Sequence, residues 1–117
     1  MHSKDAQLDT ELLQQYVEIL GVEGISASFS TFEKMCPEYL NELKSVVATE
    51  NETAIRQCAH KMKGSCRSLG FIRLGQSMEV IEKGQWSLEQ LQTRIDAWEN
   101  MLQADVKAAR AWLDQQT

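Results

Sequence analysis

The sequence predicts an all-α protein, an antiparallel up-down-up-down four-helix bundle with a short extra helix at its N-terminus. Apolar residues recur every three or four positions along almost all of the 117 residues, and no segment alternates polar and apolar side chains over the length of a strand. Short turns separate the expected helices, which places consecutive helices side by side and antiparallel. The single proline and the six glycines argue against a turn-rich β protein.

The N-terminal part of the chain predicts two helices separated by a glycine. The first is expected over 9–20, with Asp9 as its N-cap and Gly21 at its end. The second is expected over 23–48, and Pro37 should kink it without ending it, because proline removes one backbone hydrogen bond. The expected inward residues are Leu8, Leu12, Tyr16 and Ile19 or Leu20 in the first helix and Ile25, Phe29, Phe32, Cys36, Tyr39, Leu43 and Val46 in the second.

The middle of the chain predicts a third helix over 52–69. Asn51 can cap it directly, or Thr49 can cap it together with Glu52 in a capping box. Gly70 follows the last apolar position and suits the left-handed conformation in which many helices end. The expected inward residues are Ile55, Ala59, Met62, Cys66 and Leu69.

The remainder of the chain predicts two more helices, over 71–83 and 88–115. Gly84 ends the first of them, and Ser87 with Gln90 forms a capping box before the second. The expected inward residues are Leu74, Met78 and Ile81 in the first and Leu91, Ile95, Trp98, Leu102, Val106, Ala109 and Leu113 in the second.

These elements predict one domain over residues 8–117, after an N-terminal tail, residues 1–7, that is disordered or foreign to the natural protein. No run approaches the roughly 18 apolar residues of a membrane span. The N-terminus also lacks the apolar stretch of a signal peptide, so we expect a cytoplasmic protein. The three cysteines form no CxxC pair. Cys58 and Cys66 lie roughly 12 Å apart along one helix, too far for a disulfide, so we expect reduced, buried thiols.

Charge is distributed unevenly along the chain. The formal net charge is −5, from 12 basic and 17 acidic residues, which argues against a broad nucleic-acid-binding surface. The 26 residues from Thr53 to Met78 contain no Asp or Glu and carry a charge of +5, so the rest of the chain carries −10. A basic region on an acidic body is expected to attract an acidic partner or a phosphoryl group. Its basic residues are Arg56, Lys61, Lys63, Arg67 and Arg73.

His60 is the candidate reactive residue within this basic region. At 100° per residue it lies about 140° from the core axis of its helix, on the outside. Arg56, Lys63 and Arg67 lie on the same side, and Gly64 follows one turn beyond the histidine. A mid-helix glycine costs about 1 kcal/mol relative to alanine. On an outward face, helix packing does not explain it, so we expect a partner to approach the backbone beside His60 closely.

The absence of several known motifs excludes the corresponding chemistries for this histidine. Its helix offers no carboxylate for a Ser-His-Asp triad, and HExxH and nucleotide-binding glycine motifs are absent. We therefore expect the imidazole to act as a nucleophile or phosphoryl carrier, with Lys63 offsetting the phosphate charge. Two other hypotheses remain: a four-helix adaptor that binds an acidic partner through its basic patch without phosphorylation, and a histidine-dependent hydrolase.

The segment Ala59–Gly70, AHKMKGSCRSLG, resembles the signature of histidine-containing phosphotransfer (HPt) domains. That signature has the histidine, a lysine three residues later, a glycine four residues later and a second glycine ten residues later. The resemblance covers most of the chain. The sequence is most similar to the C-terminal HPt module of ArcB-type hybrid sensor kinases, which govern the response to oxygen limitation. This similarity rests on Leu8, Asp9 and Tyr16, on Phe32, Glu33, Lys34, Met35, Pro37 and Tyr39, and on Val106 and Trp112.

The resemblance implies roles for individual residues. His60 would be phosphorylated on its outer imidazole nitrogen, and Lys63 would stabilise the phosphate. HPt domains carry a polar residue, often glutamine, near the imidazole on the next helix. Glu79 and Glu82 are the candidates here for orienting the ring. The expected docking footprint for a receiver domain consists of Arg56, Lys63, Gly64, Arg67 and Lys83.

The implied mechanism is a two-step phosphorelay. A phospho-aspartate on one response-regulator receiver domain would phosphorylate His60, which would then phosphorylate the aspartate of another receiver. Each receiver would supply its own Mg²⁺, so we expect no cofactor or metal in this chain and no kinase or hydrolase activity of its own. We expect a monomer that binds neither nucleic acid nor membrane. It could be the cytoplasmic end of a membrane-bound sensor histidine kinase.

Overall fold

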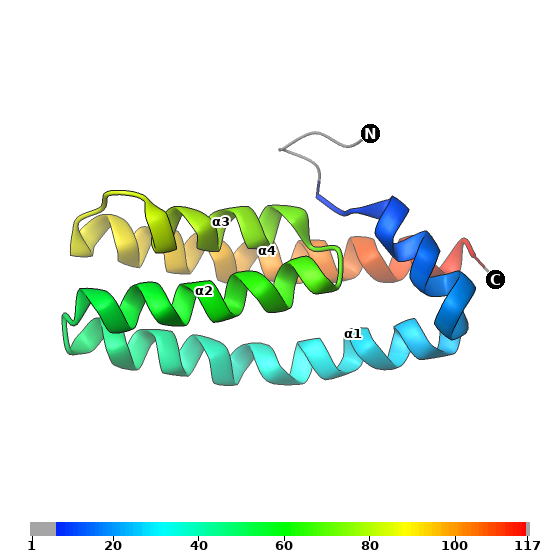
Figure 1. Cartoon of the computed structure of the whole chain (residues 1–117), viewed down its shortest axis with the longest axis horizontal. Helices are drawn as coiled ribbons and strands as arrows, with labels where there is room; N and C mark the ends of the chain where they lie inside the picture. The colour runs from blue at the N-terminus through cyan, green and yellow to red at the C-terminus, as the bar shows by residue number, and fades with distance from the viewer. Residues whose placement is uncertain (1–6, 117) are drawn as a thin grey trace.

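Four helices account for nearly all of the computed structural model, which describes residues 7–116 (Figure 1). They are α1 (Thr10–Ala48), α2 (Glu52–Ser68), α3 (Ile72–Lys83) and α4 (Leu88–Asp114). Each helix after α1 runs back along the one before it, which confirms the predicted up-down-up-down bundle. None of the helices in this described part is long and apolar enough to cross a membrane.

The long helix α1 consists of two helical segments that meet at Gly21. This residue has φ 74° and ψ 167°, a conformation that glycine adopts without the steric cost of a Cβ. The segment before Gly21 crosses one end of the bundle, and the segment after it runs along the bundle (Figure 1). The predicted break at Gly21 is therefore confirmed. The helix continues through Pro37, also as predicted.

The inward face of the first segment differs from the prediction. Leu13 is fully buried and Leu12 only partly so, and Ile19 and Leu20 are exposed. The segment caps one end of the bundle, as expected for a short extra helix. Its last turn before Gly21 lies at the corner of the molecule, which leaves Ile19 and Leu20 uncovered although they continue the apolar spacing (Figure 1).

Side-chain caps begin three of the helices. Asp9 accepts a hydrogen bond from the Leu12 amide over 3.1 Å, and Asn51 accepts one from the Ala54 amide over 3.0 Å. Asn51, rather than Thr49, is thus the cap of α2. The predicted capping box of α4 is present, with both hydrogen bonds made.

The interior of the bundle follows the apolar periodicity. Trp98 is fully buried, and its indole nitrogen donates to the carbonyl oxygen of Leu74 over 3.1 Å. The prediction missed Leu40 and Phe71, both of which are buried. All three cysteines are buried and free, as expected. Burial raises the pKa of the Cys36 thiol to about 12.

A buried carboxylate joins the N-terminal residues to the bundle. Asp105 of α4 is fully buried and pairs with the guanidinium of Arg73 on α3. The side-chain amide of Gln7 donates to the same carboxylate over 2.8 Å. Gln7, which the sequence assigned to the tail, is therefore part of the packed structure, while residues 1–6 lie outside the described residues.

Gly70 connects α2, α3 and the N-terminal segment. Its φ is +80°, and the amides of Gly70 and Phe71 donate to the Arg67 and Cys66 carbonyls, the pattern of a Schellman cap. Its carbonyl oxygen accepts from the Asp9 amide over 2.8 Å. A Cβ at Gly70 would lie 3.1 Å from Leu13 Cγ, so both the backbone conformation and the packing favour glycine.

We predict that Gly70→Ala lowers the free energy of unfolding by about 1–2 kcal/mol, because it places a Cβ in the left-handed conformation. Gly64→Ala is the matched control, since a Cβ at Gly64 meets nothing within 4 Å. It should raise the free energy of unfolding by about 0.5–1 kcal/mol through helix propensity. Urea denaturation followed by circular dichroism measures both. A Gly70→Ala protein as stable as the wild type would contradict this account of the turn.

Candidate functional site

His60 lies on the outer face of α2 and is held by a carboxylate from α3. Its side chain is 67% exposed, in agreement with the predicted outward position. Its Nδ1 lies 2.7 Å from Oε2 of Glu82. This contact joins α2 to α3, which lie side by side along their length (Figure 1). Of the two glutamates proposed to orient the imidazole, Glu82 occupies that position.

Glu82 also binds Lys63, so one carboxylate joins the two candidate reactive residues. The Lys63 ammonium lies 2.5 Å from Oε1 of Glu82. Glu82 is 17% exposed, and the whole Lys63 residue only 8%. The hydrogen bond from Lys63 holds the pKa of Glu82 below its ordinary value against the effect of burial, and the hydrogen bond with His60 acts in the same direction. Glu82 is therefore a carboxylate at neutral pH, with both of its oxygens bound.

The bound carboxylate fixes which imidazole nitrogen is available. A carboxylate only accepts hydrogen bonds, so the Nδ1 that it contacts carries the proton. In the neutral ring the lone pair then lies on Nε2. Because 67% of the His60 side chain is exposed, this nucleophilic nitrogen is on the open surface.

Lys63 differs from the sequence prediction of an exposed cation. Its residue lies between α2 and α3 and is buried. The helical wheel placed it at the edge of the outer face, where a long side chain can turn either to solvent or towards a neighbouring helix. The acid on α3, which the wheel of a single helix does not include, draws the ammonium inward.

Arg56, predicted to bind a partner, is engaged with the end of α3. Its Nη1 donates to the carbonyl oxygens of Ile81, Glu82 and Gly84 over 3.2, 2.9 and 2.9 Å. Its guanidinium also lies 4.8 Å from the centre of the Trp86 ring. The first two carbonyls belong to the last turn of α3, where intrahelical donors are missing, and the third belongs to the C-cap residue Gly84. Arg56 therefore fixes the end of the helix that carries Glu82.

Glu79, the other candidate for the imidazole, pairs with cations further along the face. Its Oε2 lies 3.2 Å from Nη2 of Arg67, and its Oε1 lies 3.6 Å from Nζ of Lys83. The charge of Arg67, with that of Lys83, lowers the pKa of Glu79 against the effect of burial. Arg67 and Lys83 both remain exposed.

The basic stretch of the sequence is neutralised by acids that the fold brings to it. Its five cations each have an acidic partner, and four of these partners come from other helices. The pairs are Arg56 with Glu52, Lys61 with Glu42, Lys63 with Glu82, Arg67 with Glu79, and Arg73 with Asp105. The prediction of a free basic patch is therefore wrong, because a count along the chain omits charges from neighbouring helices.

Gly64 is exposed one turn beyond His60. A Cβ built there meets nothing within 4 Å, so no neighbour among residues 7–116 requires glycine at this position. The predicted bare backbone beside the histidine is confirmed. His60, Gly64 and Arg67 follow one another on a single side of α2, and we call these three residues the His60 stripe.

Gly75 is a residue that the sequence analysis missed. It lies buried in α3, and a Cβ there would lie 2.8 Å from Cγ of Arg67. The Arg67 side chain thus crosses directly over the α3 backbone. A glycine in the middle of a helix was the available signal, as it was for Gly64, but the sequence did not show which side chain would cover it.

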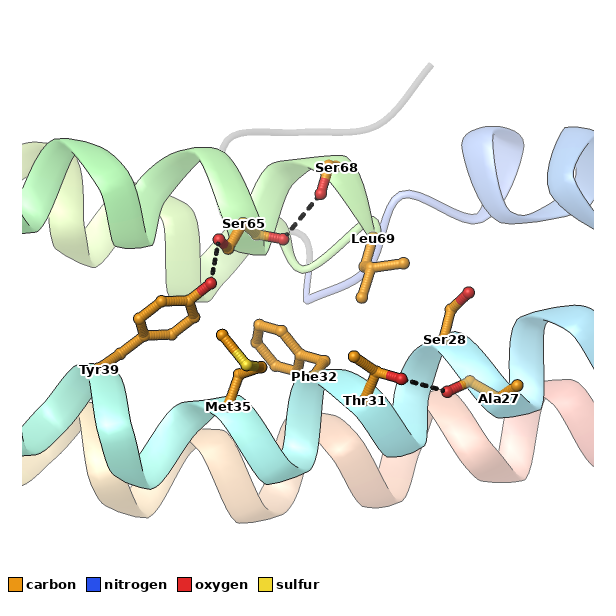
Figure 2. A pocket seen from close by; sticks show the side chains of 9 residues that line it. All are labelled: Ala27, Ser28, Thr31, Phe32, Met35, Tyr39, Ser65, Ser68 and Leu69. Atoms are coloured by element: carbon orange, nitrogen blue, oxygen red, sulfur yellow. Dashed lines mark hydrogen bonds between the residues drawn. The ribbon is translucent and has the colours of Figure 1, made fainter.

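The His60 side chain lies on an exposed face of the molecule. Within residues 7–116, no group of three or more His, Cys, Asp or Glu side chains is arranged to hold a metal ion. A hollow of about 410 Å³ lies between α1 and α2, lined by residues such as Phe32, Met35 and Leu69 (Figure 2). It does not include His60. His60 therefore lies outside this hollow, on an exposed part of α2.

Comparison with known proteins agrees with this geometry. The family model of the Hpt domain matches residues 28–110. The aerobic respiration control sensor protein ArcB of Escherichia coli O157:H7 is 30% identical over 116 residues, which cover 97% of this chain but 15% of that protein. The sensor protein TorS of Escherichia coli K12 is 26% identical over 111 residues, 95% of this chain and 11% of that protein. The chain thus spans less than a sixth of the length of these relatives.

Solved structures show the same fold. The histidine-containing phosphotransfer domain of ArcB from Escherichia coli superposes with a TM-score of 0.85 at 28% identity, covering 97% of this chain and 98% of that one. The solution structure of that domain gives a TM-score of 0.83 at 28% identity and covers 94% of its chain. By its family-model match, its fold and the exposed histidine on α2, the chain belongs to the Hpt domain family.

Proposed function

We propose that the chain is a phosphorelay carrier in two-component signalling. His60 accepts a phosphoryl group from the phospho-aspartate of one response-regulator receiver domain and transfers it to the aspartate of another. The observation that carries this proposal is the contact between Nδ1 of His60 and the Glu82 carboxylate, which leaves Nε2 as the exposed nucleophile.

Both transfers use the same nitrogen. In the first, the Nε2 lone pair attacks phosphorus, an N–P bond forms, and the P–O bond to the receiver aspartate breaks with release of its carboxylate. In the second, the carboxylate of another receiver attacks phosphorus and the N–P bond breaks. Nδ1 keeps its proton throughout and donates it in the hydrogen bond to the Glu82 carboxylate. The receivers supply the aspartates and Mg²⁺, so the carrier itself needs no nucleotide or metal.

Glu82 and Lys63 support this chemistry from the α2–α3 interface. Glu82 holds the ring orientation and its tautomer. Lys63 follows His60 by three residues, so it lies one turn along α2 from the histidine, and its buried ammonium binds the same carboxylate. Its positive charge offsets the charge that the phosphoryl group brings to His60.

The open face suits a receiver domain as the partner. Gly64 lets a partner backbone approach within contact distance of α2 beside His60. The adaptor alternative depended on a free basic patch, and the ion pairs of that region remove its basis. Since similar modules are parts of much longer sensor proteins, we further propose that this chain acts as a monomeric, cytoplasmic module of a sensor kinase.

The decisive experiment tests phosphorylation of His60. The wild-type protein, mixed with a receiver domain phosphorylated by radiolabelled acetyl phosphate and Mg²⁺, should gain an acid-labile, base-stable label. His60→Gln should gain none, since the amide offers no nucleophilic nitrogen. Equal labelling of both proteins, or no label on the wild type with any of a panel of receivers, would disprove the proposal. Incubation without a receiver should give no turnover of acetyl phosphate, which separates a carrier from a hydrolase.

Gly64→Leu should block the partner without unfolding the carrier. A side chain at Gly64 projects into open space, so the variant should unfold at the same urea concentration as the wild type or a higher one. Transfer from the phosphorylated receiver should fall by roughly 10-fold or more, because a small displacement of the reacting atoms has large effects on rate. Unchanged transfer would show that the partner approaches His60 from another side.

Substitutions of Glu82 should separate its two contacts. Glu82→Gln keeps an acceptor for Nδ1 and should retain most of the transfer rate, whereas Glu82→Ala should lose about 10-fold or more. Glu82→Gln leaves the buried Lys63 ammonium without its anion and should cost about 1–3 kcal/mol of stability at pH 7. Glu38→Ala, on an exposed residue of α1, is the matched control. Transfer at the wild-type rate by Glu82→Ala would contradict the positioning role.

The lowered pKa of Glu82 predicts that the stability difference between wild type and Glu82→Gln depends on pH. The pKa of Glu82 is lower in the folded chain than its ordinary value of 4.5. Such a group stabilises the fold above its ordinary pKa and loses that contribution as the pH falls further, through the folded-state pKa. The stability difference between wild type and Glu82→Gln should therefore narrow below about pH 4.5. Thermal unfolding at a series of pH values measures it, and a constant difference would contradict the assignment.

A further inference from the structure

Arg67 is the cation of the His60 stripe, and the proposed chemistry does not use it. Arg56 is bound to the end of α3 and Lys63 is buried on Glu82. The Arg67 side chain is 44% exposed, and its contact with Glu79 runs from Nη2 to Oε2 over 3.2 Å. A guanidinium has five N–H donors in a fork that matches a carboxylate, so one contact leaves capacity for another.

The position of Arg67 is built by the fold rather than left to chance. Its aliphatic part crosses the α3 backbone at Gly75, where any Cβ would come within 2.8 Å of Cγ. A glycine in the middle of a helix costs about 1 kcal/mol relative to alanine. Glu79 then holds the far end of the side chain. Gly75 thus sets the path of the side chain to the surface, and Glu79 occupies the guanidinium there.

Arg67 is held beside His60 by a different carboxylate. Its guanidinium pairs with Glu79, whereas His60 contacts Glu82, three residues or about 4.5 Å further along α3. A partner domain that covers Gly64 to reach His60 extends over both ends of the stripe. Arg67 then meets the docking surface of the partner next to its reacting aspartate.

We infer that Arg67 is a specificity-determining residue that binds a carboxylate on the docking surface of the receiver domain, with Glu79 occupying it in the free carrier. This inference rests on the proposed function. The receiver carboxylate lies on the same docking face as the aspartate that exchanges the phosphoryl group, because Arg67 and His60 share one side of α2. On docking, it displaces Glu79 from Arg67, and Glu79 keeps its contact with Lys83.

The test measures KM and kcat for transfer from a phosphorylated receiver that labels the wild type, at low ionic strength. Arg67→Glu should raise KM about 10-fold with little change in kcat, because like charges then meet in the interface. Arg67→Lys should recover part of the loss. Lys107→Glu is the matched charge reversal on α4, which stands diagonally across the bundle from α2, and it should leave KM within twofold of the wild type.

Two further variants separate recognition from a merely structural ion pair. Glu79→Gln frees Arg67 and should lower KM about twofold to fivefold, whereas loss of a structural pair would not improve docking. Gly75→Ala adds no charge but displaces the Arg67 side chain, so it should raise KM. In an Arg67→Ala background, Gly75→Ala should have no further effect on KM.

The outcomes distinguish this inference from the function on which it rests. Failure of the wild type to accept label from any receiver overturns both. Labelling of the wild type with an Arg67→Glu KM equal to that of Lys107→Glu overturns the role of Arg67 and leaves the carrier function intact. A reduced kcat with unchanged KM also overturns it, because that result places Arg67 in the reaction step.

Discussion

Glu82 is the carboxylate on which the reactive face depends. One of its oxygens fixes Nδ1 of His60, and the other binds the ammonium of Lys63. The two contacts need each other: Lys63 keeps Glu82 ionised in a partly buried position, and the ionised Glu82 in turn keeps the proton on Nδ1. Three backbone carbonyls at the end of α3 bind Arg56 and hold this arrangement against α2. The geometry of the nucleophile is thus set by packing between two helices.

The α2–α3 interface therefore both stabilises the bundle and positions His60. Trp86 adds to the contacts that fix the end of α3: its indole nitrogen donates to the Ile81 carbonyl, and its ring lies beneath Arg56. On the opposite side of the bundle, Arg110 of α4 binds Glu33 on α1 and anchors the other helix pair. The charged residues on α2 and α3 face one another, so the outer surface near His60 retains few free charges. Recognition then depends on shape at Gly64 and on individual side chains.

Much of the fold follows from local features of the sequence. The breaks at Gly21 and Gly70 and the caps at Asp9, Asn51 and Ser87 are set by residues within a few positions of each other, and all are found in the structure. The exposure of Ile19 and Leu20 was not predicted, because their environment depends on where the first segment crosses the bundle. Local periodicity cannot supply that position.

The site likewise combines features that follow from one helix with features that depend on how two helices pack. The outward placement of His60 and the open side of Gly64 follow from the angular positions of residues on one helix. The burial of Lys63, the choice of Glu82 over Glu79 and the cover that Arg67 gives to Gly75 depend on the register between α2 and α3. That register is a tertiary quantity, fixed by side-chain packing across the core. Sequence reasoning can name the candidates on each helix but not pair them.

In the proposed relay, the exposure of His60 would determine how long a phosphoryl group is stored. An N–P bond at this side chain, 67% of which is exposed, would stay in contact with bulk water. The lifetime of the phosphorylated state would then be close to the intrinsic chemical lifetime of a phosphoimidazole at the prevailing pH. Every receiver in the same compartment would also have physical access to the group. Fidelity of signalling would consequently come from the speed with which the correct receiver docks, since the carrier would not shield the phosphoryl group.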